Sequence, residues 1–275
     1  MAELVLPVGA VRPRLVATDL DGTLLDARGE VSARTRAVLA ELDELGVPVV
    51  FVTGRPIRWM EQLWESVGGH GLAILSNGGI VYDVATHTVR TARPIPVDVM
   101  RHVGQVLRRE VPGTTFAVEK TTGFRGEHAF MTGLQRADDA RQACESFEEI
   151  VDGDVVKLLA RHQELEPEEF WRQVETHVGE AITTTWSSVG ALVEMSALGV
   201  TKASTLERLC TELGIPRAGV VAFGDMPNDL DMMEWAGTSF AMSNAHPTVR
   251  EQALFLAGHH DEDGVAETLA ALFDL

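Results

Sequence analysis

One short stretch near the start of the chain constrains the fold most strongly, an apolar run that ends abruptly in two carboxylates. Residues 15–18 are Leu-Val-Ala-Thr, and Asp19, Leu20, Asp21 and Gly22 follow directly. Aliphatic and β-branched residues that end at Asp-Gly predict a buried strand entering a turn. Ligands bind beyond the carboxyl ends of strands in open α/β sheets, so we expect both Asp side chains to face a ligand cleft.

The spacing of the two carboxylates suggests a metal site but does not establish one. Asp19 and Asp21 are separated by one residue, so an extended tip places both side chains on the same side, where they can share a hard cation. An ordinary polar turn after a strand explains the same residues. The Asp-x-Asp pair of metal-dependent glycosyltransferases is a third reading, and the rest of the chain has to decide.

Two further apolar runs also end in polar residues. The run 47–52 leads into Thr53, Gly54 and Arg55, and the run 220–223 leads into Gly224 and a polar stretch that contains Asp225, Asn228 and Asp229. Residues 31–46 have helical spacing between the first two runs, with Ser32 as a candidate N-cap. Alternation of strands and helices predicts an α/β fold with a parallel sheet, whose strand tips lie at one edge.

The middle of the chain has a different texture. Residues 84–189 contain Thr-rich, strand-like pieces and two helical stretches, 97–110 and 167–178. We therefore expect a catalytic core formed by residues 1–83 and 190–275, interrupted by an inserted α+β unit at 84–189.

Composition narrows the class of partner. The 275 residues include 41 acidic and 23 basic side chains, for a net charge of −18, which opposes binding to nucleic acid or an anionic membrane. Cys144 and Cys210 lack the spacing of a zinc site. No run approaches the ~18 apolar residues of a membrane span, and residues 1–11 do not resemble a signal peptide. We expect a cytoplasmic enzyme, monomeric or homodimeric, acting on a small molecule.

Lysine is rare enough that each one is informative. The chain contains only Lys120, Lys157 and Lys202. Lys202 begins a helical stretch, where the positive end of the helix dipole disfavours an ammonium, so a functional reason is expected. Lys157 lies among apolar residues of the inserted unit and either points to solvent or reaches towards substrate. Lys120 follows a strand-like piece and is expected to be solvated.

Together the strand tips and Lys202 supply the parts that phosphoryl transfer requires. These parts are carboxylates for a hard cation, donors for phosphoryl oxygens, a fixed ammonium and a nucleophile. The segments DLDGT at Asp19, VTGR ending at Arg55, GVTKASTL around Lys202 and GDMPNDLDM at Asp225 resemble the four motifs of the haloacid dehalogenase (HAD) superfamily. The spacing is similar to its Cof-like branch, whose Rossmann-like core carries an inserted type IIB cap.

The resemblance implies a role for each matching residue. Asp19 would attack the phosphorus and Asp21 would act as general acid and then general base, with Thr53 and Lys202 completing the catalytic set. Mg²⁺ would be held at Asp19, Asp21, Asp225 and Asp229. The implied substrate-binding residues are Thr53, Gly54, Arg55, Asn77, Lys157, Lys202 and Asn228.

The implied activity is Mg²⁺-dependent hydrolysis of a small phosphorylated metabolite, a sugar phosphate or a phosphorylated cofactor, through an aspartyl phosphate. A sugar phosphomutase or phosphotransferase with the same chemistry is an alternative, as is a noncatalytic module that binds sugar phosphates. The glycosyltransferase reading leaves Lys202 and Asp225 unexplained.

Overall fold

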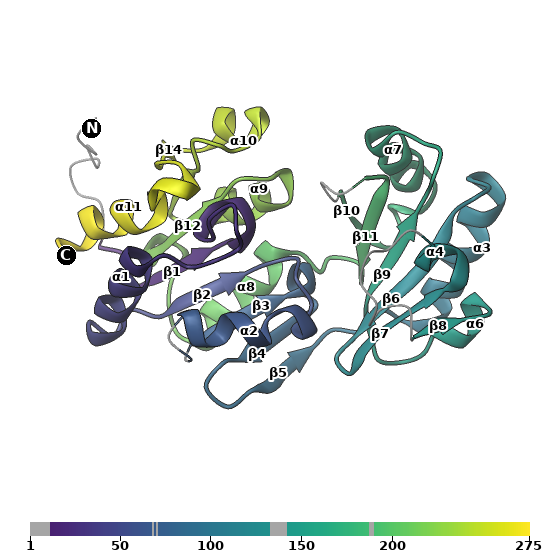
Figure 1. The fold of residues 1–275 in the computed structure, drawn as a ribbon, viewed down its shortest axis with the longest axis horizontal. Helices are drawn as coiled ribbons and strands as arrows, with labels where there is room; N and C mark the ends of the chain where they lie inside the picture. Colours follow the sequence, from purple (N-terminus) through teal and green to yellow (C-terminus); the bar gives the residue numbers. More distant parts are fainter. Residues whose placement is uncertain (1–11, 68, 70, 133–141, 187–189) are drawn as a thin grey trace. The chain divides into compact units, whose positions relative to one another are not determined.

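The computed structural model describes residues 12–67, 69, 71–132, 142–186 and 190–275. It divides into two compact units (Figure 1). The first contains Met1–Arg55, Trp59–Arg90 and Lys202–Leu275, and the second contains Pro56–Arg58 and Thr91–Thr201. The second unit is therefore an insertion into the first. In the described residues, no helix is both long enough and apolar enough to span a membrane.

The first unit is built on an eight-stranded sheet with the order β14-β13-β12-β1-β2-β3-β4-β5. Its strands are β1 (Leu15–Thr18), β2 (Val49–Val52), β3 (Leu72–Leu75), β4 (Ile80–Asp83), β5 (Thr88–Ala92), β12 (Val220–Gly224), β13 (Thr238–Ala241) and β14 (Phe255–Leu256). The strands from β14 to β3 pair in parallel, and β4 pairs antiparallel with β3. The α/β class predicted from the alternating pattern is confirmed.

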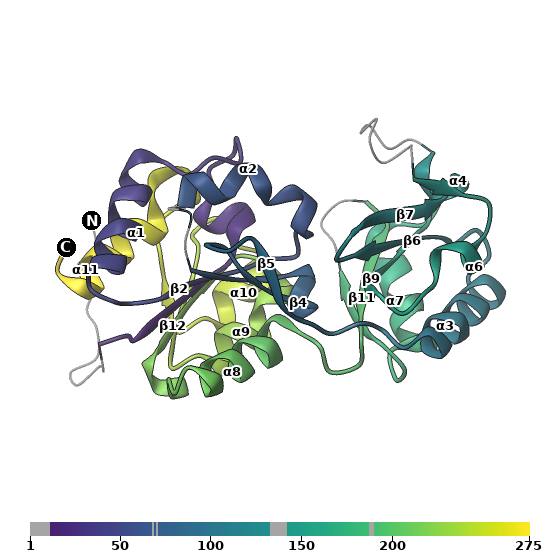
Figure 2. The ribbon, with the colours of Figure 1, turned by 90° about the horizontal axis from the view of Figure 1, so that it is seen from below.

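Helices cover both faces of this sheet, which explains why its central strands are apolar on both sides. They are α1 (Ala33–Glu44), α2 (Glu61–Trp64), α8 (Lys202–Glu212), α9 (Leu230–Trp235), α10 (Pro247–Gln252) and α11 (Gly264–Phe273). Figure 2 shows α1 and α11 on one side and α8 and α9 on the other. The Ser32 side chain accepts a hydrogen bond from the backbone N–H of Thr35, so the predicted N-cap of α1 is confirmed.

The second unit is built on a six-stranded sheet, with most of its helices on one face and one short helix on the other. Its strands, in the order β10-β11-β9-β6-β7-β8, are β10 (Thr183–Trp186), β11 (Leu192–Ser196), β9 (Val155–Arg161), β6 (Thr115–Lys120), β7 (Gly123–Glu127) and β8 (Ala143–Cys144). Its helices are α3 (Val97–Glu110), α4 (His128–Met131), α6 (Phe147–Ile150) and α7 (Pro167–Val178). One core joins α3 and α7 to inward residues of the strands, among them Phe116, Leu158 and Val193.

The limits of the inserted unit differ from the expected 84–189 at both ends. β5 extends the first sheet, because a short loop returns the chain from β4 to the same edge. β11 was expected in the core, but it pairs with β10 and β9 in the second sheet, because consecutive antiparallel strands remain neighbours. The expected boundary itself falls at residues 187–189, which lie outside the described part of the chain.

Candidate active site

Three strand tips meet at one edge of the first sheet. β1 lies between β2 and β12, and Thr18 is the partner of both Phe51 and Phe223 in the parallel ladders. Asp19, Thr53 and Asp225 directly follow these strands. The structure therefore brings the predicted polar tips together, as parallel strands require.

Three carboxylates form a buried cluster at this edge. The exposed fraction is 6% for Asp19, 7% for Asp225 and 0% for Asp229. One carboxylate oxygen from each lies within 4.8 Å of the other two. Asp229 comes from a short turn (Pro227–Asp229) after β12, and its Oδ2 accepts hydrogen bonds from the backbone N–H groups of Asp225 and Met226. These two bonds fix the turn that carries the cluster.

Lys202 occupies the space between two of these carboxylates. As the first residue of α8 it is only 2% exposed, and its Nζ lies 2.6 Å from Asp19 Oδ1 and 2.7 Å from Asp229 Oδ1. Burial alone would lower the pKa of this ammonium, but attraction to Asp19 and Asp229 prevails and places its pKa above the usual range. The helix start that disfavours a lysine is therefore compensated by two buried anions.

The carboxylates carry more negative charge than Lys202 neutralises. Burial raises the pKa of Asp19. The Lys202 ammonium opposes this rise, and the carboxylates of Asp229 and Asp225 add to it. Burial and the neighbouring Asp229 raise the pKa of Asp225 to about 6. A hard divalent cation binds carboxylate oxygens, and three buried carboxylates beside a single ammonium leave negative charge for it to neutralise. These residues therefore fit the Mg²⁺ that the resemblance implies.

Asp21 differs from Asp19 in both exposure and partner. Its side chain is 59% exposed and forms a two-point ion pair with Arg55, with Nε to Oδ2 at 2.8 Å and Nη2 to Oδ1 at 2.5 Å. The next residue, Gly22, has φ of +76°, and a Cβ there would lie 2.4 Å from Asp225 Oδ2. Glycine is therefore required where the turn approaches the cluster.

The tips of β2 and β3 are joined by backbone hydrogen bonds. Thr53 is buried, and its Oγ1 accepts a bond of 3.1 Å from the Arg55 N–H, which leaves the hydroxyl hydrogen as a donor. The N–H of Asn77 donates to the Thr53 carbonyl at 3.1 Å, and Asn77 has φ of +54°. Gly54 lies between Thr53 and Arg55, and Asn228 is half-buried in the turn with Asp229.

Lys157, by contrast, lies in the second unit. It is 2% exposed on β9, and its Nζ donates to Glu194 Oε2 at 3.0 Å. Glu119, its ladder partner on β6, forms an ion pair of 2.6 Å with Arg58. The alternative in which Lys157 points to solvent is therefore wrong. Its side chain is buried and pairs with Glu194, a residue 37 positions away in the sequence. Lys120 is also buried and pairs with Asp152, so its expected solvation is wrong too.

Thr23, Asn244 and His260 were not predicted from the sequence, although each contacts the cluster or the backbone of residues 22–25. Thr23 Oγ1 donates to Asp225 Oδ1 at 2.9 Å, and Asn244 Nδ2 donates to the Gly22 carbonyl at 2.7 Å. Asn244 follows β13, another apolar strand of the same parallel sheet, so the rule used for the other tips applied to it as well. Thr23 belongs to the Asp-Gly-Thr segment that follows β1, so its place beside the catalytic residues could have been predicted from the sequence.

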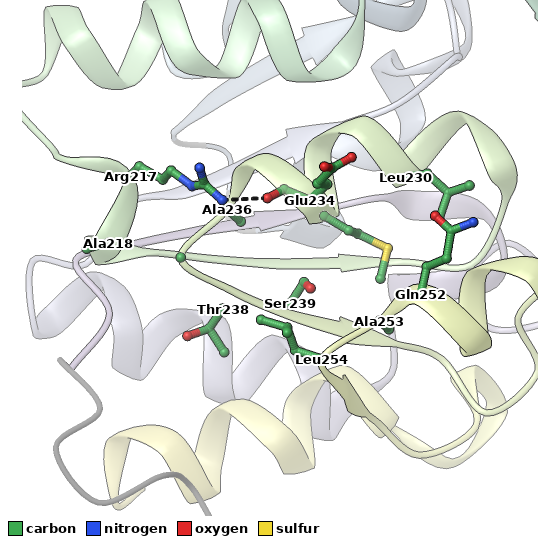
Figure 3. A pocket seen from close by; sticks show the side chains of 12 residues that line it. Arg217, Ala218, Leu230, Glu234, Ala236, Thr238, Ser239, Gln252, Ala253 and Leu254 are labelled. Carbon is green, nitrogen blue, oxygen red and sulfur yellow. Dashed lines mark hydrogen bonds between the residues drawn. The ribbon is translucent and has the colours of Figure 1, made fainter.

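A groove elsewhere in the first unit has no link to this chemistry. It encloses about 750 Å³ and is lined by α9, β13 and α10 residues, including Glu234, Thr238 and Gln252 (Figure 3). None of the predicted site residues lines it.

Comparison with known proteins identifies several similar chains. A family model described as haloacid dehalogenase-like hydrolase matches residues 16–269. A 5-amino-6-(5-phospho-D-ribitylamino)uracil phosphatase of Bacillus subtilis is 28% identical, over 93% of this chain and 94% of that protein. An HMP-PP phosphatase of Serratia proteamaculans is 30% identical, again over 93% and 94% of the two chains. A solved HAD subclass IIB sugar phosphatase has a TM-score of 0.76 at 20% identity, covering 93% of this chain and 97% of that one, a likeness of fold.

Proposed function

The chain belongs to the haloacid dehalogenase-like hydrolases, and from this premise we propose that it is a Mg²⁺-dependent phosphatase of small phosphorylated metabolites. The observation that carries the proposal is Lys202, held between Asp19 and Asp229 beside a buried carboxylate cluster. In that arrangement the Lys202 ammonium holds the Asp19 carboxylate in place and opposes the rise in its pKa that burial causes. Phosphatases among the relatives support the same reaction class.

In this proposal Asp19 is the nucleophile. One carboxylate oxygen attacks phosphorus, the bond to the leaving oxygen breaks, and an aspartyl phosphate forms. Asp21 donates the proton that the leaving oxygen needs, and it then removes a proton from the water that hydrolyses the acyl phosphate. The exposed position of Asp21 suits this role, because its carboxyl group must reach the substrate and water in turn.

Donors at the neighbouring strand tips would bind the phosphoryl oxygens. The Thr53 hydroxyl retains its hydrogen, and Gly54, Asn77 and Asn228 follow β2, β3 and β12 at the same edge. Arg55 would bind phosphate or hold Asp21, and Lys202 would offset charge on the transferring group.

Mg²⁺ would be held by Asp19 and Asp225 together with the backbone carbonyl of Asp21, with Asp229 completing the carboxylate cluster. When bound, it supplies positive charge beside the phosphoryl oxygens and relieves repulsion within the cluster. Asp229 would also orient Lys202, through the contact already described.

We assign recognition of the leaving group to the inserted unit, which corresponds to a cap. Lys157 on β9 pairs with Glu194 on β11, and Glu119 on β6 pairs with Arg58, so charged groups lie on three neighbouring strands of its sheet. Such groups favour a leaving group rich in hydrogen-bonding atoms over an apolar one. Phosphorylated sugars and cofactors meet this description, and a cytoplasmic location would supply them.

A panel of phosphorylated metabolites tests the proposal. The wild-type protein with Mg²⁺ should release inorganic phosphate from at least one sugar phosphate or phosphorylated cofactor, and Asp19→Asn should lose this activity while its thermal transition is retained. A mutase would return phosphate to an organic product, and a binding module would shift its melting temperature with ligand but release nothing. Either result would overturn hydrolysis as the function.

A further inference from the structure

The turn that carries the proposed acid/base is irregular and needs support from outside. Residues Leu20–Leu24, the catalytic turn, contain Asp21 with φ −74° and ψ 118° and Gly22 with φ +76°, both outside helical values. Glycine at positive φ is conformationally permissive, so the local sequence alone does not hold this geometry. Asp21 is the most exposed member of the predicted catalytic set, whereas Asp19, Thr53 and Lys202 are buried.

Two side chains from later in the chain bind backbone carbonyls of this turn and of its exit. Asn244 Nδ2 donates to Gly22 O at 2.7 Å, and His260 Nδ1 lies 2.8 Å from Leu25 O. Because a carbonyl only accepts, Nδ1 of His260 must carry the hydrogen. The two residues are also linked, since the His260 N–H donates to Asn244 Oδ1 at 3.1 Å. The Asn244 amide is thereby oriented at both ends.

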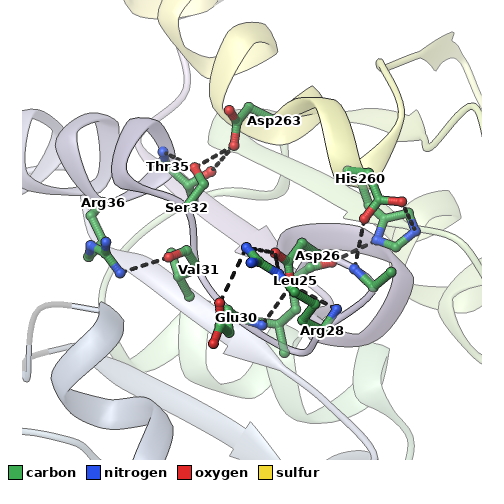
Figure 4. Close-up of polar contacts among 12 residues, drawn as sticks. Leu25, Asp26, Arg28, Glu30, Val31, Ser32, Thr35, Arg36, His260 and Asp263 are labelled. Atoms are coloured by element: carbon green, nitrogen blue, oxygen red, sulfur yellow. Dashed lines mark hydrogen bonds and ion pairs between the residues drawn. The ribbon is translucent and has the colours of Figure 1, made fainter.

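The contacts continue beyond the turn (Figure 4). Asp261 Oδ1 accepts a bond of 2.7 Å from the Ala27 N–H, and Asp263 Oδ1 accepts from the hydroxyls of Ser32 and Thr35 at the start of α1. His260 and Asp263 therefore lie along the segment that leads from the catalytic turn into α1. Side chains of residues 260–263 thus contact the chain at several points between Leu25 and Thr35.

We propose that Asn244 and His260 form a positioning clamp that holds the carbonyls of Gly22 and Leu25, and thereby the backbone on which Asp21 is carried. The inference rests on the proposed phosphatase function. The turn lies directly against Asp225, through the hydrogen bond of Thr23 and the close approach of Gly22. A small displacement of the turn therefore moves Asp21 relative to the carboxylate cluster. Neither clamp residue touches substrate in this account.

Three single variants, one double variant and a matched control test the clamp in the full-length protein. Asn244→Ala removes both bonds of the amide, Asn244→Asp keeps the acceptor for His260 and loses the donor to Gly22, and His260→Phe removes the bond to Leu25. Thr268→Ala is the matched control, because its buried hydroxyl donates to Gly264 O within its own helix, α11. Each is assayed for turnover of a small aryl phosphate and for backbone hydrogen exchange.

The clamp variants should lower kcat about 10- to 100-fold with KM within about threefold, because a misplaced group costs rate more than binding. The Leu25 amide, which donates to Leu20 O in the wild type, should exchange about tenfold faster, while β2 exchanges unchanged. The double variant Asn244→Ala/His260→Phe should lose less than the product of the two single losses. Thr268→Ala should leave kcat and Leu25 exchange unchanged.

Two results would overturn the clamp. One is kcat within about twofold of wild type in Asn244→Asp and His260→Phe. The other is exchange that rises equally throughout the first unit, which indicates general destabilisation. If the wild type releases no phosphate, the proposed function fails, and exchange at Leu25 alone then decides: unchanged exchange in Asn244→Ala refutes the clamp, and selective acceleration supports it.

Discussion

Each of the two units buries a lysine to the same extent, and their surroundings differ. Lys202 and Lys157 are both 2% exposed, and both contact carboxylates. Lys202 lies among Asp19, Asp225 and Asp229, so its cluster holds three acidic groups and one basic group. The cluster of Lys157 contains Glu119, Glu194 and Arg58, two acidic and two basic groups.

The difference teaches that charge balance, more than burial, separates the proposed chemical site from the proposed recognition site. A balanced buried cluster satisfies its own charges and needs no further ion. A cluster with surplus carboxylates is stable only if a cation binds or a carboxyl group takes up a proton. The pKa of Asp225 is raised first by burial and then by the neighbouring carboxylate of Asp229. Three predictions test this contrast.

Removal of the metal should have the largest effect. Exhaustive chelation with EDTA should abolish phosphate release, and added Mg²⁺ should restore it, because the surplus charge lies at the catalytic cluster. The melting temperature should also rise when Mg²⁺ is returned, and Asp225→Asn should lose that rise. Undiminished turnover after chelation would end the distinction between the two clusters.

Matched lysine substitutions should have the next largest effect. Lys202→Met should lower kcat about 10³-fold or more on any substrate, because the ammonium offsets charge on Asp19 and on the transferring phosphoryl group. Lys157→Met should change kcat on a small aryl phosphate by less than about threefold. The same variant should raise KM for the preferred metabolite about tenfold, since one buried polar contact is lost. Equal losses from the two variants on the aryl phosphate would remove the division of labour.

The smallest predicted effect is on stability without metal. The pKa of Asp225 is raised from 3.8 to about 6 in the folded state, so the folded protein binds more protons than the unfolded chain between these values. Stability contributed by this group is therefore lost as pH rises from about 4 to about 6. In EDTA at pH 7, urea unfolding should give Asp225→Asn a free energy of unfolding about 1–3 kcal/mol above that of the wild type. Near pH 4 the two proteins should differ little. A less stable Asp225→Asn protein at pH 7 would contradict the charge surplus.

The strand tips could be predicted from sequence because the chemistry and the fold give the same signal there. Asp19, Thr53 and Asp225 each follow an apolar run, and parallel pairing places such tips at one edge without further information. The cap of α1 at Ser32 is equally local. These features depend on residues close together in the chain.

What escaped prediction depends on register and on distant partners. Burial of Lys157 follows from β9 pairing beside β11, which sets Glu194 within reach. The ends of the inserted unit follow from β5 and β11, each of which pairs with the strand that precedes it in the chain. The position of Asn244 after an apolar strand could have placed it at the same edge of the sheet. Its bond to a backbone carbonyl could not be predicted, because an Asn in a turn carries no pattern that distinguishes this role from an ordinary turn.

The central claim is that Asp19 becomes phosphorylated, and mass spectrometry of an acid-quenched reaction tests it most directly. Asp21→Asn should slow hydrolysis of the acyl phosphate, so mixing this variant with Mg²⁺ and substrate should trap protein that carries one phosphoryl group, on the peptide that contains Asp19. Asp19→Asn should carry none under the same conditions. Wild-type turnover without any phosphorylated Asp19 in the trapped variant, or a phosphoryl group on another residue, would contradict the account.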